Sequence, residues 1–305
     1  MTRLAWIVVM GVATTTAAAQ APRGHVGHPS SSGDGPRSGS AGSPGSTRTA
    51  DSIRLAPMLM AARRATERYR SLEAAIADGF RRTGPDMPTL GEHWVSLSRI
   101  ASGGVDPDNP PVLIYVRRQG SPVLAGIAYT ALLGAGEAFP DAPVPARYWH
   151  EHNGSVAEEI LPLSHGAHRL PANGTRLAVA HAWVWLENPA GVWESDHWAL
   201  PWQRLGISVD TIVPNASRAA ALMSGGDEYY ANVIGVPAAR AAHVRSLLEA
   251  ARDSVAMLVR GATSVDAAGQ VAIAAIWARA AERIIELGDP AWAERARHIL
   301  LGQDR

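Results

Sequence analysis

Two residue types that carry much of protein chemistry are missing from this chain. None of its 305 residues is cysteine, which excludes a disulfide framework and the lipid-bearing cysteine of a bacterial lipoprotein. No residue is lysine either, so arginine supplies every permanent positive side chain. This absence excludes Schiff-base chemistry on lysine and the lysine of a phosphate-binding P-loop.

A surplus of positive charge is also absent, since the formal net charge at pH 7 is +0. No basic stretch could track a phosphate backbone, so nucleic acid is not an expected partner. No apolar segment after the first residues approaches the length of a membrane span. The mature chain is therefore expected to have no membrane-spanning helix.

The first residues have the pattern of a secretory signal peptide. Arg3 provides a positive start, Leu4 to Val12 form a short apolar run, and small residues end at Ala21. We therefore predict a signal peptide over residues 1–21, and a periplasmic or secreted protein. Residues 22–50 are rich in Ser, Gly and Pro, which predicts a disordered linker.

The rest of the chain predicts an α+β fold. Apolar residues recur at helical spacing from Leu55 to Ile76, which indicates an amphipathic helix that Gly79 closes. Short β-type runs follow, and Gln119 to Pro122 have the pattern of a hairpin turn. The expected strands of an antiparallel sheet are residues 91–100, 111–116, 123–129 and 176–186.

Helical spacing returns after Pro214. Longer helices are expected from Pro237 to Gly261 and from Val265 to Leu287, and Asp289 with Pro290 favours the start of a last helix. The predicted organisation is an α+β domain with a sheet rich in histidine and tryptophan over residues 51–210, and a helical C-terminal region over residues 211–305. The sheet is thus expected to be flanked by helices at both ends of the chain.

Six of the ten tryptophans and six of the eleven histidines lie between Trp149 and Trp202. In an extended segment His150 and His152 would point to one side and could chelate one ion. His93 and His181 complete the predicted metal site, and His197 is a further candidate. Neutral imidazoles suit zinc or copper, among other transition metals. Surface and loop histidines without a metal are the alternative.

The strand period also predicts a ligand-binding face. His181, Trp183, Trp185 and Glu187 would lie on one side of a strand that reached Leu186. Together with Trp149, these indoles could stack on an organic ligand or a partner protein without any metal. The alternative is that the tryptophans belong to an ordinary core.

The sequence gives less support to an enzymatic function than to a binding function. A cupin-like metalloenzyme would use His-x-His followed by a glutamate, but the spacings here are longer than that pattern. A metalloenzyme would also need a base, for which Glu151 or Glu187 is available. No Gly-x-Ser-x-Gly elbow of a serine hydrolase occurs. The sequence therefore favours a binding protein over an enzyme.

Two motifs resemble those of a group of uncharacterised secreted bacterial proteins. The first is Gly91-Glu92-His93-Trp94-Val95, and the second runs from His181-Ala182-Trp183-Val184-Trp185 to Asn188-Pro189-Ala190-Gly191. The resemblance covers about residues 60 to 200. It implies export and the importance of His93 and His181, and it implies no reaction. The expected function is an exported binding protein that coordinates a transition-metal ion through sheet histidines.

Overall fold

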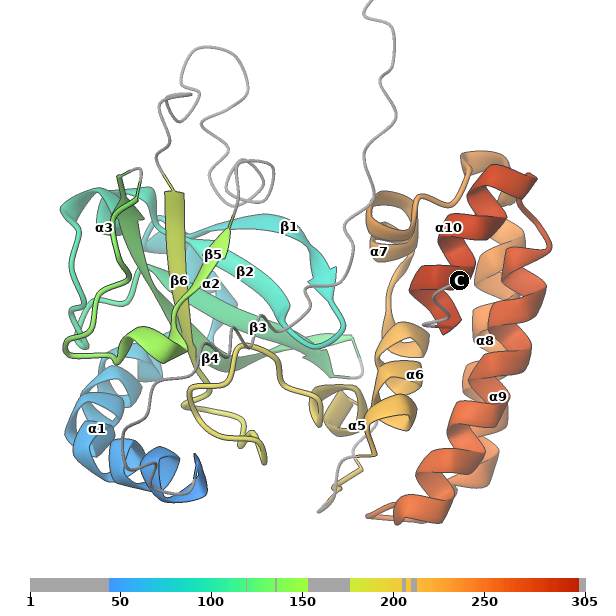
Figure 1. Cartoon of the computed structure of the whole chain (residues 1–305), viewed down its shortest axis with the longest axis horizontal. Helices are drawn as coiled ribbons and strands as arrows, with labels where there is room; N and C mark the ends of the chain where they lie inside the picture. The colour runs from blue at the N-terminus through green and yellow to red at the C-terminus, as the bar shows by residue number, and fades with distance from the viewer. Residues whose placement is uncertain are drawn as a thin grey trace, which may run out of the picture.

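The computed structural model describes residues 44–118, 120–134, 136–152, 176–204, 207–209 and 213–301. Figure 1 shows the sheet with the N-terminal helices on one side of the molecule and the C-terminal helices on the other. The α+β fold expected from the sequence is confirmed. The predicted signal peptide and most of the predicted linker lie outside the described residues. Helix α1 nevertheless begins at Pro44, so the prediction of disorder up to residue 50 is wrong for its last seven residues.

The sheet has six antiparallel strands in the order β1-β2-β3-β4-β6-β5. Their bounds are β1 Arg81–Met87, β2 Gly91–Val95, β3 Val112–Arg118, β4 Ser121–Leu133, β5 His150–His152 and β6 Arg176–Ala182. The hairpin predicted around Gly120 is confirmed as the turn between β3 and β4. β1 was missed by the sequence analysis, and the strand expected to reach Ile100 ends at Val95, where α3 follows.

The helices before and between the strands are short except for the first. They are α1 Pro44–Thr66, η1 Glu67–Arg70, α2 Leu72–Ala77, α3 Leu97–Ser102 and η2 Ala146–Tyr148. The single helix predicted from Leu55 to Ile76 is therefore interrupted. The break occurs at Ser71, whose extended backbone starts α2 and whose side chain accepts a hydrogen bond from Ala74 N.

The helical C-terminal region follows β6. Its elements are α5 Leu200–Arg204, α6 Pro214–Ser224, α7 Asp227–Tyr229, η4 Tyr230–Ile234, η5 Ala238–Arg240, α8 Ala241–Leu258, α9 Ala267–Ile285 and α10 Pro290–Leu301. The predicted cap of the last helix is confirmed, because Asp289 Oδ1 accepts a hydrogen bond of 2.9 Å from Trp292 N. Among the described residues, no helix combines the length and apolarity that crossing a bilayer requires.

The two faces of the sheet bury different residues. One face, which we call the α1 face, packs Trp94, Leu113 and Ile127 against Leu55 and Tyr69 of the N-terminal helices. The opposite face, which we call the histidine face, packs a smaller cluster that includes Ile100 of α3 and Leu200 of α5. It also contains Val95, Ile114, Val179 and Trp183. A third core lies among the C-terminal helices and includes Trp202 of α5.

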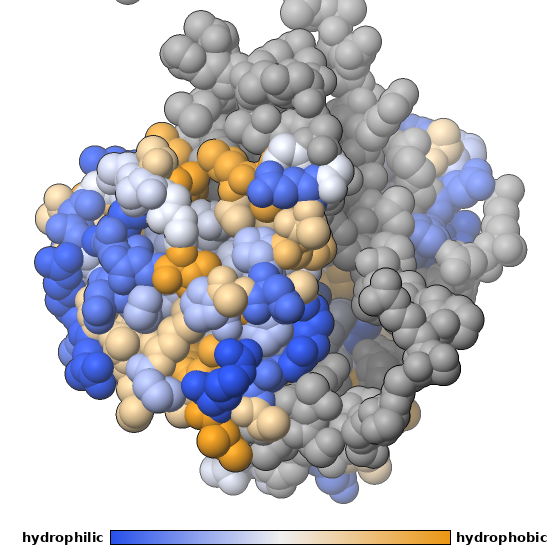
Figure 2. All heavy atoms as spheres, turned by 60° about the vertical axis from the view of Figure 1, so that its left-hand side comes forward, coloured by the Kyte–Doolittle hydropathy of each residue, from blue (hydrophilic) through white to orange (hydrophobic). Residues whose placement is uncertain are grey.

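Side chains on the surface around α1 are mixed in character. Figure 2 shows the side of the molecule that lies at the left in Figure 1, where hydrophilic and apolar residues are interspersed. The exposed large apolar residues of α1 and α2 are Ile53, Met60 and Ile76. A shallow depression lined by Met60, Arg63, Arg64 and Glu67 also lies on this helix.

Candidate functional site

Three of the four histidines predicted to bind a metal come together on the histidine face. In register, His93 pairs with Ile114, His181 with Ala128, and His150 with Val179. His93 Nε2 lies 3.4 Å from His181 Nε2. The ring centroids of His150 and His181 are 4.9 Å apart, with the rings edge to face. Residues from β2, β5 and β6, far apart in the sequence, thus form one cluster.

β4 lets these imidazoles meet, although β3 and β4 separate the strands that carry His93 and His181. The residues that β4 contributes here are Gly126, paired with Ile114, and Ala128, paired with His181. A β-carbon on Gly126 would lie only 2.7 Å from Ala182 O. Glycine at position 126 therefore allows β4 to pack closely against the end of β6.

His181 is held in one tautomer by the loop after β6. Its Nδ1 lies 2.7 Å from Ser195 O. Because a carbonyl oxygen can only accept, Nδ1 carries the hydrogen, and Nε2 presents a lone pair toward His93. Burial lowers the pKa of His181, and the Ser195 carbonyl and Asp196 offset only part of that effect. The ring is therefore neutral at pH 7 and available as a ligand.

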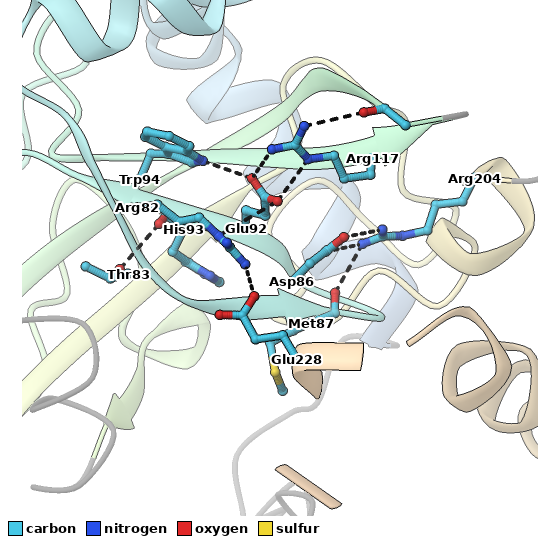
Figure 3. Close-up of polar contacts among 11 residues, drawn as sticks. Arg82, Thr83, Asp86, Met87, Glu92, His93, Trp94, Arg117, Arg204 and Glu228 are labelled. Carbon is cyan, nitrogen blue, oxygen red and sulfur yellow. Dashed lines mark hydrogen bonds and ion pairs between the residues drawn. The ribbon is translucent and has the colours of Figure 1, made fainter. Parts of the chain in front are cut away.

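The strand that carries His93 is fixed by a buried carboxylate on the opposite face. Glu92, 3% exposed, accepts hydrogen bonds from Arg117 Nε at 2.9 Å and Trp94 Nε1 at 3.2 Å. Arg82 of β1 lies within 3.8 Å of the same carboxylate. Figure 3 shows this arrangement, with Thr83 donating to the carbonyl oxygen of His93. Glu92 thereby ties β1, β2 and β3 together.

The hairpin of β1 and β2 is also tied to the C-terminal helices. Arg204 of α5 forms two hydrogen bonds with Asp86, at 2.6 and 2.7 Å. Arg82 pairs with Glu228 of α7 (Figure 3). Met87, at the end of β1, packs against the helical core. The hairpin that contains His93 is thus connected to both parts of the molecule.

Replacing Glu92 by glutamine tests this anchoring. Glutamine has no negative charge and only one acceptor oxygen, so it cannot replace both hydrogen bonds of Arg117 to the carboxylate. We therefore expect Glu92→Gln to lower the free energy of unfolding by about 2 kcal/mol. Urea denaturation followed by circular dichroism measures the change. Glu249→Gln, an exposed residue of α8, is the matched control and should change stability by less than about 0.5 kcal/mol. Equal stability of the two variants would contradict the anchoring role.

In the part of the chain that the structure describes, the indole of Trp183 lies between His197, the further candidate, and His181. The ring of Trp183 lies 6.1 Å from His181 and 4.8 Å from His197, measured between centroids. His197 is completely buried, and burial lowers its pKa to about 4, offset in part by the backbone of Glu187 and of His197 itself. Within the described part of the chain, its ring nitrogens make no hydrogen bond of ordinary geometry. His197 is therefore a neutral core residue.

The predicted tryptophan face does not form. β6 ends at Ala182, and Trp183 N bonds to Val192 O instead of continuing the strand. Trp183 packs on the histidine face, but Trp185 and Trp149 belong to the α1 face. Each indole already has a protein acceptor: Glu194 O for Trp183, Thr66 Oγ1 for Trp185 and Val144 O for Trp149. The prediction of one stacking platform is therefore wrong.

The structure describes the other predicted residues, His152, Glu151 and Glu187, only in part. The backbone of β5 is extended as expected, with His152 paired to Leu177. The side chains of His152 and Glu151 lie outside the described residues. Glu187 is exposed and beyond the end of β6, so it does not share a face with His181. Its predicted place beside the cluster is thus wrong.

A pocket of about 230 Å³ adjoins the histidines. Its lining comes from two segments. The first runs from η2 into β5 and contributes Arg147, Tyr148, Trp149 and His150, and the second is the loop after β6, with Trp193, Glu194 and Ser195. The rings of Tyr148 and Trp193 stack at 5.9 Å. The guanidinium of Arg147 lies over the Tyr148 ring, 4.9 Å from its centroid. Trp149 and His150 of this lining were predicted from the sequence as site residues, but the other five, which come from segments far apart in the chain, were not.

The described residues do not contain a finished metal site: in those ranges, no three His, Cys, Asp or Glu side chains are arranged to hold an ion. The close pair is His93 with His181, and His150 lies beside it. No protein-family model matches the chain, and no curated protein or solved structure shows significant similarity to it. The resemblance to secreted bacterial proteins therefore stays a prediction.

Proposed function

We propose that this chain is an exported protein that binds one transition-metal ion between His93 and His181, with His150 as the third ligand. The observation that carries the proposal is the separation of 3.4 Å between the two Nε2 atoms. Two imidazoles on one tetrahedral zinc, each with a Zn–N bond of about 2.05 Å, have nitrogens about 3.3 Å apart. The pair therefore already has the spacing of two ligands on one ion.

The surroundings of His181 support the same proposal. Metal-binding histidines usually donate their second ring N–H to a carbonyl or carboxylate, which fixes the ring and directs the other nitrogen at the metal. Ser195 O has this role for His181. Because burial keeps this ring neutral, no proton has to be displaced from Nε2 before a metal binds. A direct hydrogen bond from His93 to His181 is the metal-free alternative.

His150 supplies the third ligand in this proposal. It is half-buried, it lies on an edge strand of three residues, and its ring contacts that of His181. A rotation of its side chain is needed to complete the site, and a short edge strand allows that adjustment. Neutral nitrogen ligands favour zinc or copper(II). Export rests on the signal peptide predicted over residues 1–21, so the expected location is periplasmic or secreted.

Metal analysis of the purified mature protein tests the proposal. The protein is incubated with zinc or copper and dialysed. We then expect about one bound metal ion per chain, measured by inductively coupled plasma mass spectrometry. His181→Ala should reduce bound metal, because the preoriented ligand is lost. His150→Ala should weaken binding by at least about tenfold, since loss of even an outer-shell partner of a ligand costs about 10- to 100-fold. His243→Ala, an exposed residue of α8, is the control and should leave the stoichiometry unchanged.

Two results would contradict the proposal. One is a wild-type protein that keeps no metal under any loading condition. The other is a metal content that is the same in the wild type, in His181→Ala and in the double variant of His93 and His181 to alanine. Circular dichroism of each variant separates loss of ligands from loss of fold. The signal peptide is tested separately, by determining the N-terminus of the protein after expression in a bacterial host.

A further inference from the structure

Helix α1 has apolar side chains on the side that faces away from the sheet. Ile53, Pro57 and Met60 are exposed there, with exposed fractions of 71% for Ile53 and 55% for Met60. Steps of four and three residues place these side chains in one line along the helix. Leu55 and Ala62, about half a helical turn away, are buried in the core beneath the helix. α1 therefore has one apolar line in the core and a second one in contact with solvent.

The charged residues exposed on α1 between Ile53 and its end are all arginines. Arg54 and Arg63 lie on either side of the apolar line, and Arg64 continues that line toward the end of the helix. Asp51 is the single carboxylate residue in the sequence of α1. It is 7% exposed and already pairs with arginine, so it does not offset the positive charge at the surface. The outer side of α1 thus combines apolar side chains with permanent positive charge.

Contacts within the protein orient these arginines without using all of their donors. The guanidinium of Arg63 lies 4.6 Å from the centroid of the Trp185 ring and donates a hydrogen bond to Val184 O. Glu67, the first exposed carboxylate after α1, pairs with Arg70 at 3.2 Å. A guanidinium has five N–H donors, so contacts of this kind leave donors for a phosphate group outside the protein.

We propose that the outer side of α1, with Ile53, Met60, Arg54, Arg63 and Arg64, docks on the surface of an anionic lipid membrane. A helix at a membrane surface buries apolar side chains near the boundary of headgroups and acyl chains, and its arginines meet lipid phosphates. The charge of α1 is complementary to such a surface, because its one carboxylate is buried. A basic helix with exposed apolar residues is typical of proteins that bind membrane surfaces.

Docking through α1 is independent of the proposed metal site. α1 packs on one face of the sheet, whereas His93 and His181 pair in register with Ile114 and Ala128, which belong to the core of the opposite face. A membrane on the outer side of α1 would therefore leave the histidine face uncovered. Metal binding and membrane binding can accordingly be measured separately, and either can fail without the other.

Sedimentation with lipid vesicles tests the proposal on the full mature protein. The vesicles are phosphatidylcholine alone, or phosphatidylcholine with about 30% phosphatidylglycerol as the anionic lipid. We expect the protein to bind the anionic vesicles at least about tenfold more tightly than the neutral ones. Salt at about 0.5 M should remove most of this difference, because it screens the charges.

A pair of double variants tests the apolar line. Ile53→Ser combined with Met60→Ser should weaken binding to anionic vesicles by at least about tenfold, because no apolar side chain of this length remains to enter the lipid. Met257→Ser combined with Val271→Ser is the matched control. These two residues are also exposed, but they belong to α8 and α9, on the other side of the molecule (Figure 1). The control should bind as the wild type does.

Arg64 provides the test of charge. Arg64→Glu changes the charge by two units and should weaken binding to anionic vesicles by about twentyfold. Arg64→Lys keeps the charge and should bind within about twofold of the wild type. Arg279→Glu makes the same reversal at an exposed arginine of α9 and should leave binding nearly unchanged.

The absence of cysteine from the chain allows the docked side to be identified directly. Met60→Cys and Met257→Cys each accept one fluorophore whose emission shifts to the blue in an apolar environment. Anionic vesicles should shift the emission of the label at position 60 and leave that of the label at position 257 unchanged. Circular dichroism of each variant first confirms the wild-type fold.

Four results would overturn the proposal. The first is a wild-type protein that does not bind anionic vesicles or binds both kinds equally. The second is binding that neither the double serine variant of α1 nor Arg64→Glu weakens, and the third is a blue shift at position 257 instead of position 60. The fourth comes from sedimentation equilibrium without lipid: a dimer that the double serine variant dissociates would assign the outer side of α1 to a second copy of the chain.

Discussion

Gly91→Ala is expected to destabilise the protein by about 3–5 kcal/mol, a loss large enough to unfold many domains. Gly91 begins β2 with a φ of 74°, which an alanine adopts only at a cost of about 1–2 kcal/mol. A β-carbon at this position would also lie 2.4 Å from Tyr115 O, a backbone atom of the neighbouring strand. Neither atom can move without disturbing the pairing of β2 with β3.

Gly120→Ala is the matched control for this prediction. Gly120 has a φ of 82° in the turn between β3 and β4, but no atom lies within 4 Å of its added β-carbon. The two variants therefore share the backbone strain and differ in the clash. Urea denaturation should show a loss of about 1 kcal/mol for Gly120→Ala. Equal losses of stability in the two variants would contradict the close contact between Gly91 of β2 and Tyr115 O of β3.

Stability should also fall steeply in weak acid, on the order of 3 kcal/mol from His197 alone. Burial lowers the pKa of this histidine to about 4 in the folded protein, whereas an unfolded histidine has a pKa of about 6.5. Between these values the unfolded chain binds the extra proton. The contribution of His197 is therefore fully present above about pH 6.5 and is lost as the pH falls toward 4.

His197→Phe isolates this contribution from that of the carboxylates. Phenylalanine keeps a flat ring against Trp183 and cannot titrate, so the variant should lose less stability than the wild type between pH 6.5 and 4. His243→Ala, with an exposed histidine removed, should follow the wild-type curve. The measurement is urea denaturation of the metal-free protein at several pH values. If the free energy of unfolding of His197→Phe depends on pH as that of the wild type does, His197 is not buried as a neutral ring.

Local signals predicted much of the fold. The turn around Gly120 lies between two runs of β-forming residues, and the helices after Pro237 have clear apolar periodicity. β1 was missed because Arg81 to Met87 contains Gly84 and Pro85 and has no alternation of apolar residues. It is a strand because it pairs with β2 at the edge of the sheet. Pairing of this kind does not appear in a local pattern.

The site was predictable only in its histidines. The predicted ligands were His93, His150, His152 and His181. The structure brings His93, His150 and His181 together, and the side chain of His152 lies outside the described residues. The end of β6 could not be foreseen, because it depends on Trp183 N bonding to Val192 O. The role of Ser195 was equally hidden, since its contact with His181 uses a backbone carbonyl that every residue possesses.

The hairpin of β1 and β2 couples the unfolding of the sheet to that of the C-terminal helices. It is held to the sheet by Glu92 and to the C-terminal helices by Asp86 and by Arg82, which meet Arg204 and Glu228. Freeing the helices would break those pairs and release the strand on which His93 sits. Thermal unfolding of the sheet and of the C-terminal helices should therefore occur in a single cooperative transition, in which neither part stays folded without the other.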